Sequence, residues 1–428
     1  MKNEKPKVVI VGCGFGGIEL AKSLRKKLFD VLLIDKQNYH TFQPLLYQVA
    51  SGGLEPGNIA YPIRRIIRKS KNVHFRMCEV QKVDVSRKKI ETTSGDIEYD
   101  FLVIATGSTT NFFNFDPEKA PLLPLKSVSE ALDIRSYFIQ NIEKAISTYD
   151  PAKRTELINV GVIGGGPAGI ELAGALAEMR SHVLPHDYPE IDFSKMKIHL
   201  FEAAPRLLSG MSEKSSAYTL SFLEKLNVEV SLDSKVVEIT DHYIKLEDGT
   251  EFITDTVIWT AGVTCPKIEG LPEDGVTKGN RVLIDEYNRS QIDKSVFAIG
   301  DAAAHVTEQT PKGLPMLAPV AVQHAKHLAK NLIRIQKEKE LIPFEYVNKG
   351  VMATIGRNKA VVDLPKGKLQ GGLAWFIWMF VHVWSLIGFR NKLFTFVDWT
   401  VNYFNYDRPL GIIIRPYIRK EEKNSGKK

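Results

Sequence analysis

The sequence has little cysteine: Cys13, Cys78 and Cys265 are the only three among 428 residues. No two of them form a CxxC or similar pair, so the spacing excludes a zinc site, an iron–sulfur cluster and a redox-active disulfide. We interpret them as small buried residues. A signal peptide is also missing, because the apolar run after Lys7 is short and interrupted by glycines. We therefore expect the body of the protein in the cytoplasm.

A basic surface is missing from most of the chain as well. The net charge is +7, but residues 390–428 hold nine basic and four acidic side chains and so supply +5 of it. The remaining body is close to neutral, which argues against nucleic acid as a partner. At 44% hydrophobic and 25% charged residues, the composition is that of a globular protein with two or three domains.

The segment KVVIVGCGFGGIELAKSLRK contains a dinucleotide-binding fingerprint. A β-branched run leads into Gly12, Gly14 and Gly17, and a helical pattern follows. These glycines allow a tight turn, a close approach of the backbone to a pyrophosphate, and a tight helix–strand contact. The next expected strand, DVLLID, ends at Asp35, where an acidic side chain accepts hydrogen bonds from ribose hydroxyls.

The same pattern recurs in VGVIGGGPAGIELAGAL, with Gly164, Gly166 and Gly169 between a strand and a helix. Its ribose acid is Glu202, at the end of KIHLFE. The gap of 38 residues from Gly164 is longer than usual, and we assign the excess to an insertion, RSHVLPHDYPEIDFSKM. One such fingerprint is weak support for a nucleotide site, but two with strand, helix and acid in order are strong.

Three later strands complete this pattern. The strand in YDFLVIATGS leads into Thr106 and Gly107, DTVIWTAGV reaches Gly262, and SVFAIGDAAA delivers Asp301 to a turn. With these motifs the chain resembles the flavoproteins with two dinucleotide-binding domains. The resemblance implies FAD on the first fingerprint, NAD(P)H on the second, and Asp301 beside the flavin's ribityl and pyrophosphate region. Because the carboxylate of Glu202 would repel a 2′-phosphate, we expect NADH rather than NADPH.

The expected fold class is α/β, with two Rossmann-like dinucleotide-binding domains and a C-terminal amphipathic helical segment that anchors the protein to a membrane. The FAD domain is expected to be discontinuous, with the NADH domain inserted into it. The expected boundaries are 1–125 and 285–355 for the FAD domain, 126–284 for the NADH domain, and 356–428 for the anchoring region.

Within the flavoproteins, the stretch DKQNYHTFQPLLYQVASGGLEPGNIAYP holds no sulfur, which argues against a thiol shuttle beside the flavin. The chain resembles the type II, non-proton-pumping NADH:quinone oxidoreductases from Val8 to about Arg415. The motifs that carry the resemblance are NYHTFQPLLYQVASG, GGGPAGIELAGALAE, FEAAPRLL, IWTAGV and FAIGDAA. Two alternatives stay open: a soluble flavoprotein reductase of a small electron-carrier protein, and an enzyme like the sulfide:quinone oxidoreductases. A redox-sensing flavoprotein that binds nucleic acid would require a basic face, and the nearly neutral body of this chain argues against that class.

The resemblance also implies site residues. Flavin contacts carry over to Gly12, Cys13, Gly14, Phe15, Gly16, Gly17, Asp35, Lys36, Val80, Thr106, Gly107, Asp301 and Ala318. Quinone contacts carry over to Pro44, Tyr47, Pro319 and Gln323, where Pro319 replaces a glutamine of the family's AQxAxQ element. Glu171, two residues after Gly169, matches a carboxylate near the nicotinamide and the flavin. It orients the nicotinamide, relays protons to quinone, or serves only as an acid in a first helical turn.

The sequence has one long uncharged run, Gly371–Phe389, with three of the five tryptophans. Its glycines, His382 and many aromatics favour an interface over a membrane span, and basic residues flank both ends. A one-sided stripe at Leu393, Phe396, Val397, Thr400 and Phe404 follows. We therefore expect residues 369–405 to form two helices that bind anionic lipids on the cytoplasmic face of the inner membrane. A homodimer is compatible with the sequence, which does not decide it.

Overall fold

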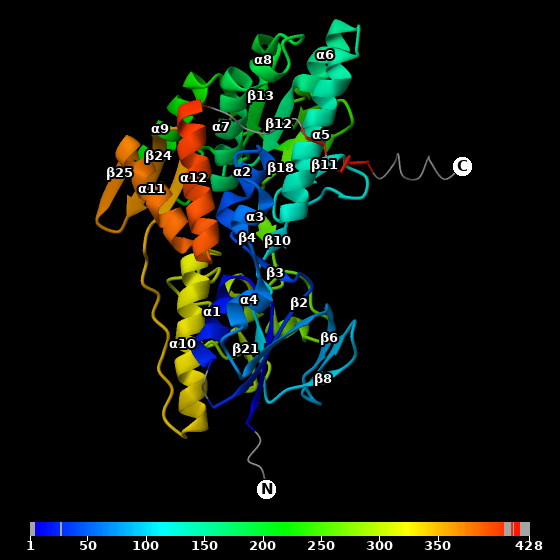
Figure 1. The fold of residues 1–428 in the computed structure, drawn as a ribbon. Helices are drawn as coiled ribbons and strands as arrows, with labels where there is room; N and C mark the ends of the chain where they lie inside the picture. The colour runs from blue at the N-terminus through cyan, green and yellow to red at the C-terminus, as the bar shows by residue number, and fades with distance from the viewer. Residues whose placement is uncertain (1–4, 26–27, 406–411, 414, 420–428) are drawn as a thin grey trace. The chain divides into compact units, whose positions relative to one another are not determined.

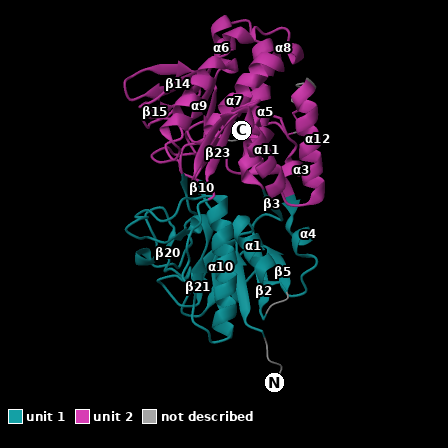
Figure 2. Cartoon of the chain, turned by 90° about the vertical axis from the view of Figure 1, so that its left-hand side faces the viewer, with its two compact units in different colours: residues 1–41, 61–109, 263–348 teal, residues 42–60, 110–262, 349–428 magenta. Residues whose placement is uncertain are grey.

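The computed structural model describes residues 5–25, 28–405, 412–413 and 415–419 (Figure 1). These residues divide into two compact units. Unit 1 comprises residues 1–41, 61–109 and 263–348, and unit 2 comprises 42–60, 110–262 and 349–428 (Figure 2). This division by contacts puts the segment 42–60 with unit 2. The expected domain boundaries divide the chain by the nucleotide that each part binds rather than by contacts within the fold. They remain a prediction.

Unit 1 is built on a five-stranded parallel sheet in the order β21-β9-β1-β2-β5. Its central strands are continuous apolar runs, such as VVIV in β1, because both faces of the sheet are covered. The elements assigned to this unit are β1 Lys7–Val11, α1 Phe15–Leu24, β2 Asp30–Asp35, β3 Tyr39–Thr41, α4 Ile63–Ile67, β5 Val73–Met77, β6 Val80–Asp84, β7 Lys89–Thr92, β8 Ile97–Glu98, β9 Phe101–Ile104, β19 Val263–Thr264, β20 Val282–Leu283, β21 Val296–Ala298, β22 Ala303–Ala304 and α10 Ala318–Gln336, with 3₁₀ turns η3 Glu273–Gly275 and η4 Gly300–Ala302.

Unit 2 contains a second parallel sheet, in the order β11-β18-β12-β13-β14. Its elements are η1 Gln43–Leu45, α2 Leu46–Ala50, α3 Pro56–Ile59, β11 Leu122–Pro124, α5 Val128–Ile146, α6 Pro151–Ile158, β12 Val160–Ile163, α7 Pro167–His182, α8 Leu184–Asp187, η2 Phe193–Lys195, β13 Ile198–Phe201, α9 Glu213–Lys225, β14 Val228–Ser231, β15 Val236–Ile239, β16 Tyr243–Leu246, β17 Glu251–Ile253 and β18 Thr256–Trp259. Two strands, β4 Ala60–Pro62 and β10 Thr109–Thr110, lie where the chain passes from one unit to the other. The expectation of two Rossmann-like sheets is confirmed.

The C-terminal part of unit 2 differs in one respect from expectation. A three-stranded antiparallel sheet, β23 Val351–Gly356, β24 Lys359–Leu364 and β25 Gly367–Gly371, precedes the helices. The start of the expected helical region is therefore strand, because residues 351–356 and 359–364 pair antiparallel around a tight turn and bury the short, mostly apolar runs at 353–355 and 360–362.

Two C-terminal helices follow, α11 Gly372–Ser385 and α12 Phe389–Asn405 (Figure 1). Their presence confirms the prediction of a helical pair. At about 1.5 Å per residue, α11 is about 21 Å long, short of the hydrocarbon thickness. Among the described residues, no helix is long and apolar enough to cross a membrane.

Candidate active site

The first fingerprint loop joins β1 to α1, and its three glycines are under different steric constraints. A Cβ added to Gly12 would lie 2.3 Å from the Ala105 carbonyl oxygen, and one added to Gly17 would lie 1.9 Å from the Gly12 carbonyl oxygen. Gly12 also has a positive φ of 106°. At Gly14, by contrast, the added Cβ would meet no described heavy atom within 4 Å. The fold itself requires the outer two glycines, whereas the space at the middle one fits a phosphate that approaches the backbone.

Asp35, at the end of β2, closes this loop. One carboxylate oxygen accepts a hydrogen bond from the Cys13 amide at 2.6 Å, and the other accepts one from the Gln37 amide at 2.8 Å. Burial raises the pKa of Asp35, and these two N–H donors act against that shift. Burial likewise raises the pKa of the Cys13 thiol, with the Asp35 charge adding to the effect. Cys13 is therefore a neutral packing residue rather than a nucleophile.

Asp301 lies in η4, after β21, and four side chains hold its turn. Ser108 Oγ donates to the Asp301 carboxylate at 2.5 Å. The Asp301 carbonyl accepts from Arg281 Nε at 3.0 Å and from the Cys265 thiol at 3.2 Å. The Gly300 amide donates to Nδ1 of the buried His324 at 3.2 Å. The sequence analysis predicts none of these four partners: Arg281, Cys265 and His324 belong to no motif, and Ser108 follows Gly107 in the YDFLVIATGS segment without a predicted role.

The other predicted flavin residues of unit 1 lie at or near the ends of its strands and helices. Thr106 and Gly107 follow β9, Phe15 begins α1, Val80 begins β6, Ala318 begins α10, and Lys36 is exposed beside Asp35. Gly16 packs against Ile299, since an added Cβ would lie 3.1 Å from that side chain. At Gly107, φ is +68°, and a Cβ there would find open space within the described part of the chain. The residues present therefore fit an FAD.

Pro319 and Gln323 lie on the first turns of α10. The Gln323 side-chain amide makes a two-way pair with the backbone of Val347: Nε2 donates to the carbonyl and Oε1 accepts from the amide, both at 3.0 Å. As folded, Gln323 thus fixes the segment after α10.

The second fingerprint loop, between β12 and α7, repeats the first. A Cβ added to Gly164 would lie 2.8 Å from the Ala261 nitrogen, and one added to Gly169 would lie 1.9 Å from the Gly164 carbonyl oxygen. A Cβ added to Gly166 would meet no heavy atom of the described residues within 4 Å. Glu202, after β13, accepts from the amides of Gly165 at 2.5 Å and Ala204 at 2.8 Å. The long gap before Glu202 is filled by the end of α7 and by α8 and η2. Gly262 follows β18 with φ of +70°.

Glu171 lies on α7 and faces β23. Helix and strand pack closely at Gly174, where an added Cβ would lie 1.8 Å from the Ile355 carbonyl oxygen. That close approach brings the Thr354 amide within 3.3 Å of the Glu171 carboxylate. Burial raises the pKa of Glu171 to about 8, although the Thr354 amide and the Trp378 indole act in the opposite direction. The carboxyl therefore holds a proton at neutral pH.

Glu171 opens into a cavity of about 100 Å³ within unit 2. Its lining comes from α2 and the loop after it, α7, the end of β23, α11 and α12: Tyr47, Gln48, Ser51, Gly53, Glu171, Ala175, Glu178, Thr354, Gly356, Arg357, Trp375, Trp378, Trp399, Asn402 and Tyr403. Trp399 Nε1 donates to Gln48 Oε1 at 2.6 Å, and Gln48 Nε2 donates to the Tyr47 hydroxyl at 2.8 Å. Of the predicted quinone residues, Tyr47 lines this cavity, and Pro44 lies in η1 just before α2.

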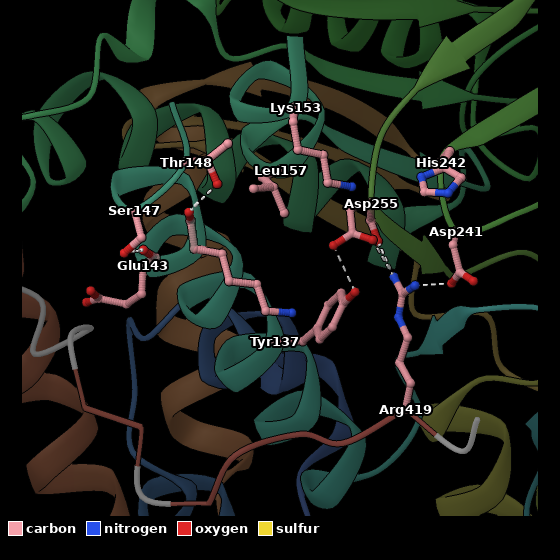
Figure 3. Close-up of a pocket in the computed structure, with 11 residues that line it drawn as sticks. Tyr137, Glu143, Ser147, Thr148, Lys153, Leu157, Asp241, His242, Asp255 and Arg419 are labelled. Carbon is pink, nitrogen blue, oxygen red and sulfur yellow. Dashed lines mark hydrogen bonds and ion pairs between the residues drawn. The ribbon is translucent and has the colours of Figure 1, made fainter. Parts of the chain in front are cut away.

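A larger cavity of about 740 Å³ lies elsewhere in unit 2 and holds none of the predicted site residues (Figure 3). There Arg419 of the C-terminal segment forms ion pairs with Asp241 and, at 2.9 Å, with Asp255, and its guanidinium lies 4.8 Å from the Tyr137 ring centroid. The Tyr137 hydroxyl also donates to Asp255 at 3.0 Å. These interactions satisfy the charges around Arg419, so the arrangement is that of a structural contact.

Comparisons with known proteins agree with this geometry. Residues 6–325 match the pyridine nucleotide-disulphide oxidoreductase family, and residues 348–405 match the NDH2 C-terminal domain. The type II NADH:quinone oxidoreductase Ndh of Mycobacterium tuberculosis is 34% identical, over 94% of this chain and 89% of that protein. The type II NADH:quinone oxidoreductase of Staphylococcus aureus strain NCTC 8325 is 29% identical, over 84% and 90%.

The fold has a counterpart among solved structures. NDH2 from Plasmodium falciparum in complex with NADH superposes with a TM-score of 0.87, covering 95% of this chain and 100% of that one, at 23% sequence identity. The matched domains span both fingerprint loops and the two C-terminal helices, as the resemblance in the motifs implies. The protein belongs to the type II NADH:quinone oxidoreductase family.

Proposed function

We propose that this protein oxidises NADH and reduces a membrane quinone through bound FAD, without pumping protons. The carrying observation is that α7 begins at the second fingerprint loop, whose glycine amide pairs with Glu202, and also carries Glu171, a buried carboxyl that lines a cavity. When bound, FAD supplies two-electron redox chemistry, which no side chain here offers. The first fingerprint loop, Asp35 and Asp301 would hold it, and the second loop with Glu202 would hold NADH.

In this proposal the protein's side chains position substrates and deliver protons. The overall reaction, NADH + H⁺ + quinone → NAD⁺ + quinol, takes one proton from solution. Glu171, whose pKa burial raises to about 8, serves in this proposal as the acid that gives a proton to the quinone oxygen. Within unit 2, Tyr47 and Pro44 are proposed to contact the quinone ring; the assignment of Pro319 and Gln323 to the quinone stays a prediction from the family resemblance.

The test is NADH oxidation by the FAD-loaded protein, followed at 340 nm with and without a short-chain ubiquinone or menaquinone analogue. We expect rapid oxidation only with quinone present. Equal rates with a ferredoxin-type carrier protein, or quinone reduction driven by sulfide instead of NADH, would overturn the proposal in favour of the corresponding flavoprotein class.

We also propose that α11 and α12 dock the enzyme on the cytoplasmic face of the inner membrane. Exposed apolar residues repeat along one side of α11 at Leu373, Phe376, Phe380 and Trp384, and along α12 at Phe389, Leu393, Phe396, Val397, Val401 and Phe404. Buried Ala374, Trp378 and His382 mark the opposite side of α11. Such a one-sided stripe fits the interface of a bilayer. Each aromatic buried there contributes about 1.5–3 kcal/mol, and each nearby basic residue about 1 kcal/mol with anionic lipid.

Vesicle flotation tests this docking. The protein should float with phosphatidylglycerol-containing vesicles. The double variant with Phe380→Asp and Phe396→Asp should stay at the bottom of the gradient while keeping FAD. If the double variant still floats, the stripe does not bind the membrane. If the two changes instead dissociate a homodimer in lipid-free buffer, the stripe is a dimer interface. A tag after Lys428 should be digested from the cytoplasmic side of inverted vesicles.

A further inference from the structure

The cavity beside Glu171 contains a second carboxylate, Glu178, for which the quinone chemistry described above has no role. Both residues come from α7, seven positions apart, so they lie on the same side of the helix about 10 Å apart along its axis. Ala175, between them, also lines the cavity. Glu171 is only 7% exposed, whereas Glu178 is partly exposed to solvent. The cavity therefore connects a buried acid with one that solvent can reach.

The Glu178 carboxylate is held in place from the facing strand. Its Oε1 accepts a hydrogen bond from the Arg357 amide at 2.5 Å, next to the close-packed Gly356. The Arg357 guanidinium in turn donates to the Asn402 carbonyl at 2.6 Å and lies 5.0 Å from the Tyr403 ring centroid. These contacts tie the outer end of the cavity to α12.

The cavity lining includes polar groups among its aromatic side chains, and the cavity is large enough for water. Ser51, only 1% exposed, lines it, and its hydroxyl has no hydrogen-bond partner among the residues that the structure describes. A buried hydroxyl of this kind normally bonds to water. At about 30 Å³ per molecule, a volume of about 100 Å³ holds about three waters. At a spacing of about 2.8 Å, three waters bridge about 10 Å.

We propose that Glu178 is the proton-uptake residue that reloads Glu171 through waters in this cavity. The inference rests on the proposed quinone reductase function. In each turnover the Glu171 carboxyl gives its proton to the reduced quinone oxygen and becomes a carboxylate. A cavity water protonates that carboxylate, Glu178 gives a proton to the water chain, and solvent protonates Glu178. The net result is the one solution proton that the overall reaction consumes.

The charged and titratable side chains that line the cavity are few. α7 provides Glu171 and Glu178, the end of β23 provides Arg357, and α2 and α12 provide the phenols of Tyr47 and Tyr403. The lining residues of α11 are Trp375 and Trp378, neither of which titrates. Among these groups, Glu178 is the carboxylate nearest the outer end, and it is the one suited to accept a proton from solvent.

Glu178→Gln separates the two roles that this side chain could have, because glutamine still accepts a hydrogen bond from the Arg357 amide but cannot carry a proton. In the FAD-loaded enzyme we expect quinol formation at pH 8.5 to slow about tenfold, with a smaller effect at pH 6. The solvent deuterium isotope effect on that step should rise. Glu178→Asp should restore most of the rate, and Glu190→Gln, on the exposed surface, is the matched control.

A double variant tests whether the two acids act in series. If they do, Glu171→Gln with Glu178→Gln should be no slower than Glu171→Gln alone, because the route is already broken at its inner end. Multiplied defects, or a Glu178→Gln enzyme with an unchanged pH profile and isotope effect, would overturn the proton route. If the unaltered protein oxidises NADH without any need for quinone, the proposed function itself has failed, and the two failures are thereby distinct.

Discussion

The tetrapeptide Gly-Ile-Glu-Leu occurs twice, at Gly17–Leu20 in unit 1 and at Gly169–Leu172 in unit 2. In both copies a Cβ added to the glycine would lie 1.9 Å from the carbonyl oxygen of the first fingerprint glycine. The glutamates, however, differ. Glu19 remains partly exposed and lies 3.6 Å from the Lys326 ammonium of α10, while Glu171 is buried with its pKa raised to about 8.

The difference between the two glutamates comes from what packs on each helix. α1 packs against α10, which brings a lysine to Glu19. α7 packs against β23, which brings a backbone amide and tryptophan-rich helices to Glu171. The shared motif thus determines the loop and the helix, whereas the neighbouring element determines whether the glutamate is a partly exposed ion-pair partner or a buried carboxyl. The following changes test that distinction, from the largest expected effect to the smallest.

The glycines test whether the two loops are equivalent. Gly17→Ala and Gly169→Ala should each destabilise the fold by about 4 kcal/mol or more, because the new methyl group would overlap a backbone oxygen. Gly14→Ala should leave the free energy of unfolding of the apoprotein nearly unchanged but lower FAD affinity severely. Thermal unfolding and flavin content after gel filtration measure the two effects. Full FAD occupancy in Gly14→Ala would mean that the open space at this loop is not a phosphate site.

The two glutamates are each other's control. Glu171→Gln should slow reoxidation of the enzyme by quinone about a hundredfold, the ordinary size of a general-acid contribution, while Glu19→Gln should change it less than twofold. Stopped-flow absorbance separates this step from reduction by NADH. Equal effects of the two changes would mean that burial of Glu171 has no part in the chemistry.

The raised pKa of Glu171 also predicts a pH dependence. The acid is protonated below about pH 8 and loses its proton as the pH rises through that value. Quinone reduction should therefore fall above about pH 8 in the unaltered enzyme. In Glu171→Gln the rate is low, and this fall is absent. Because the pKa is raised from 4.5 in the unfolded chain to about 8 in the folded one, the stability that Glu171 contributes should decline as the pH rises from about 4.5 to about 8 and level off above that value, and the glutamine variant should lose that decline. Measured rates and melting temperatures from pH 6 to 9.5 check both statements.

Glu202 tests the nucleotide preference of the second loop. Glu202→Arg should raise kcat/KM for NADPH relative to NADH by about ten- to a hundredfold, since a carboxylate that repels the 2′-phosphate is replaced by a cation. Glu202 also accepts hydrogen bonds from Gly165 and Ala204, so Glu202→Gln serves as a control that keeps an acceptor there. If the ratio does not move, the acid of this loop does not contact the ribose.

Much of this arrangement could be predicted because the determinants are local in the sequence. Both loops, Asp35 and Glu202 follow from glycine spacing and strand ends, and the amides of Cys13 and Gly165 meet these acids as that geometry requires. The surroundings of Glu171 could not be predicted, because Thr354 and Trp378 reach it only after residues nearly two hundred positions away have packed on α7. The strands β23 and β24 contain only short apolar runs on either side of a turn, and such short runs do not distinguish a strand from part of a buried helix.

The smallest expected effect concerns Gln323, the predicted quinone contact that belongs to unit 1. Its amide is already paired with the Val347 backbone in both directions, so any contact with quinone uses the remaining lone pair or hydrogen. Gln323→Ala should raise the quinone KM about three- to tenfold, the size of one lost hydrogen bond, and leave the NADH KM unchanged. Gln336→Ala, at the end of α10, is the matched control. A defect confined to the reduction of the enzyme by NADH would remove Gln323 from the quinone site and leave it as a support for the segment after α10.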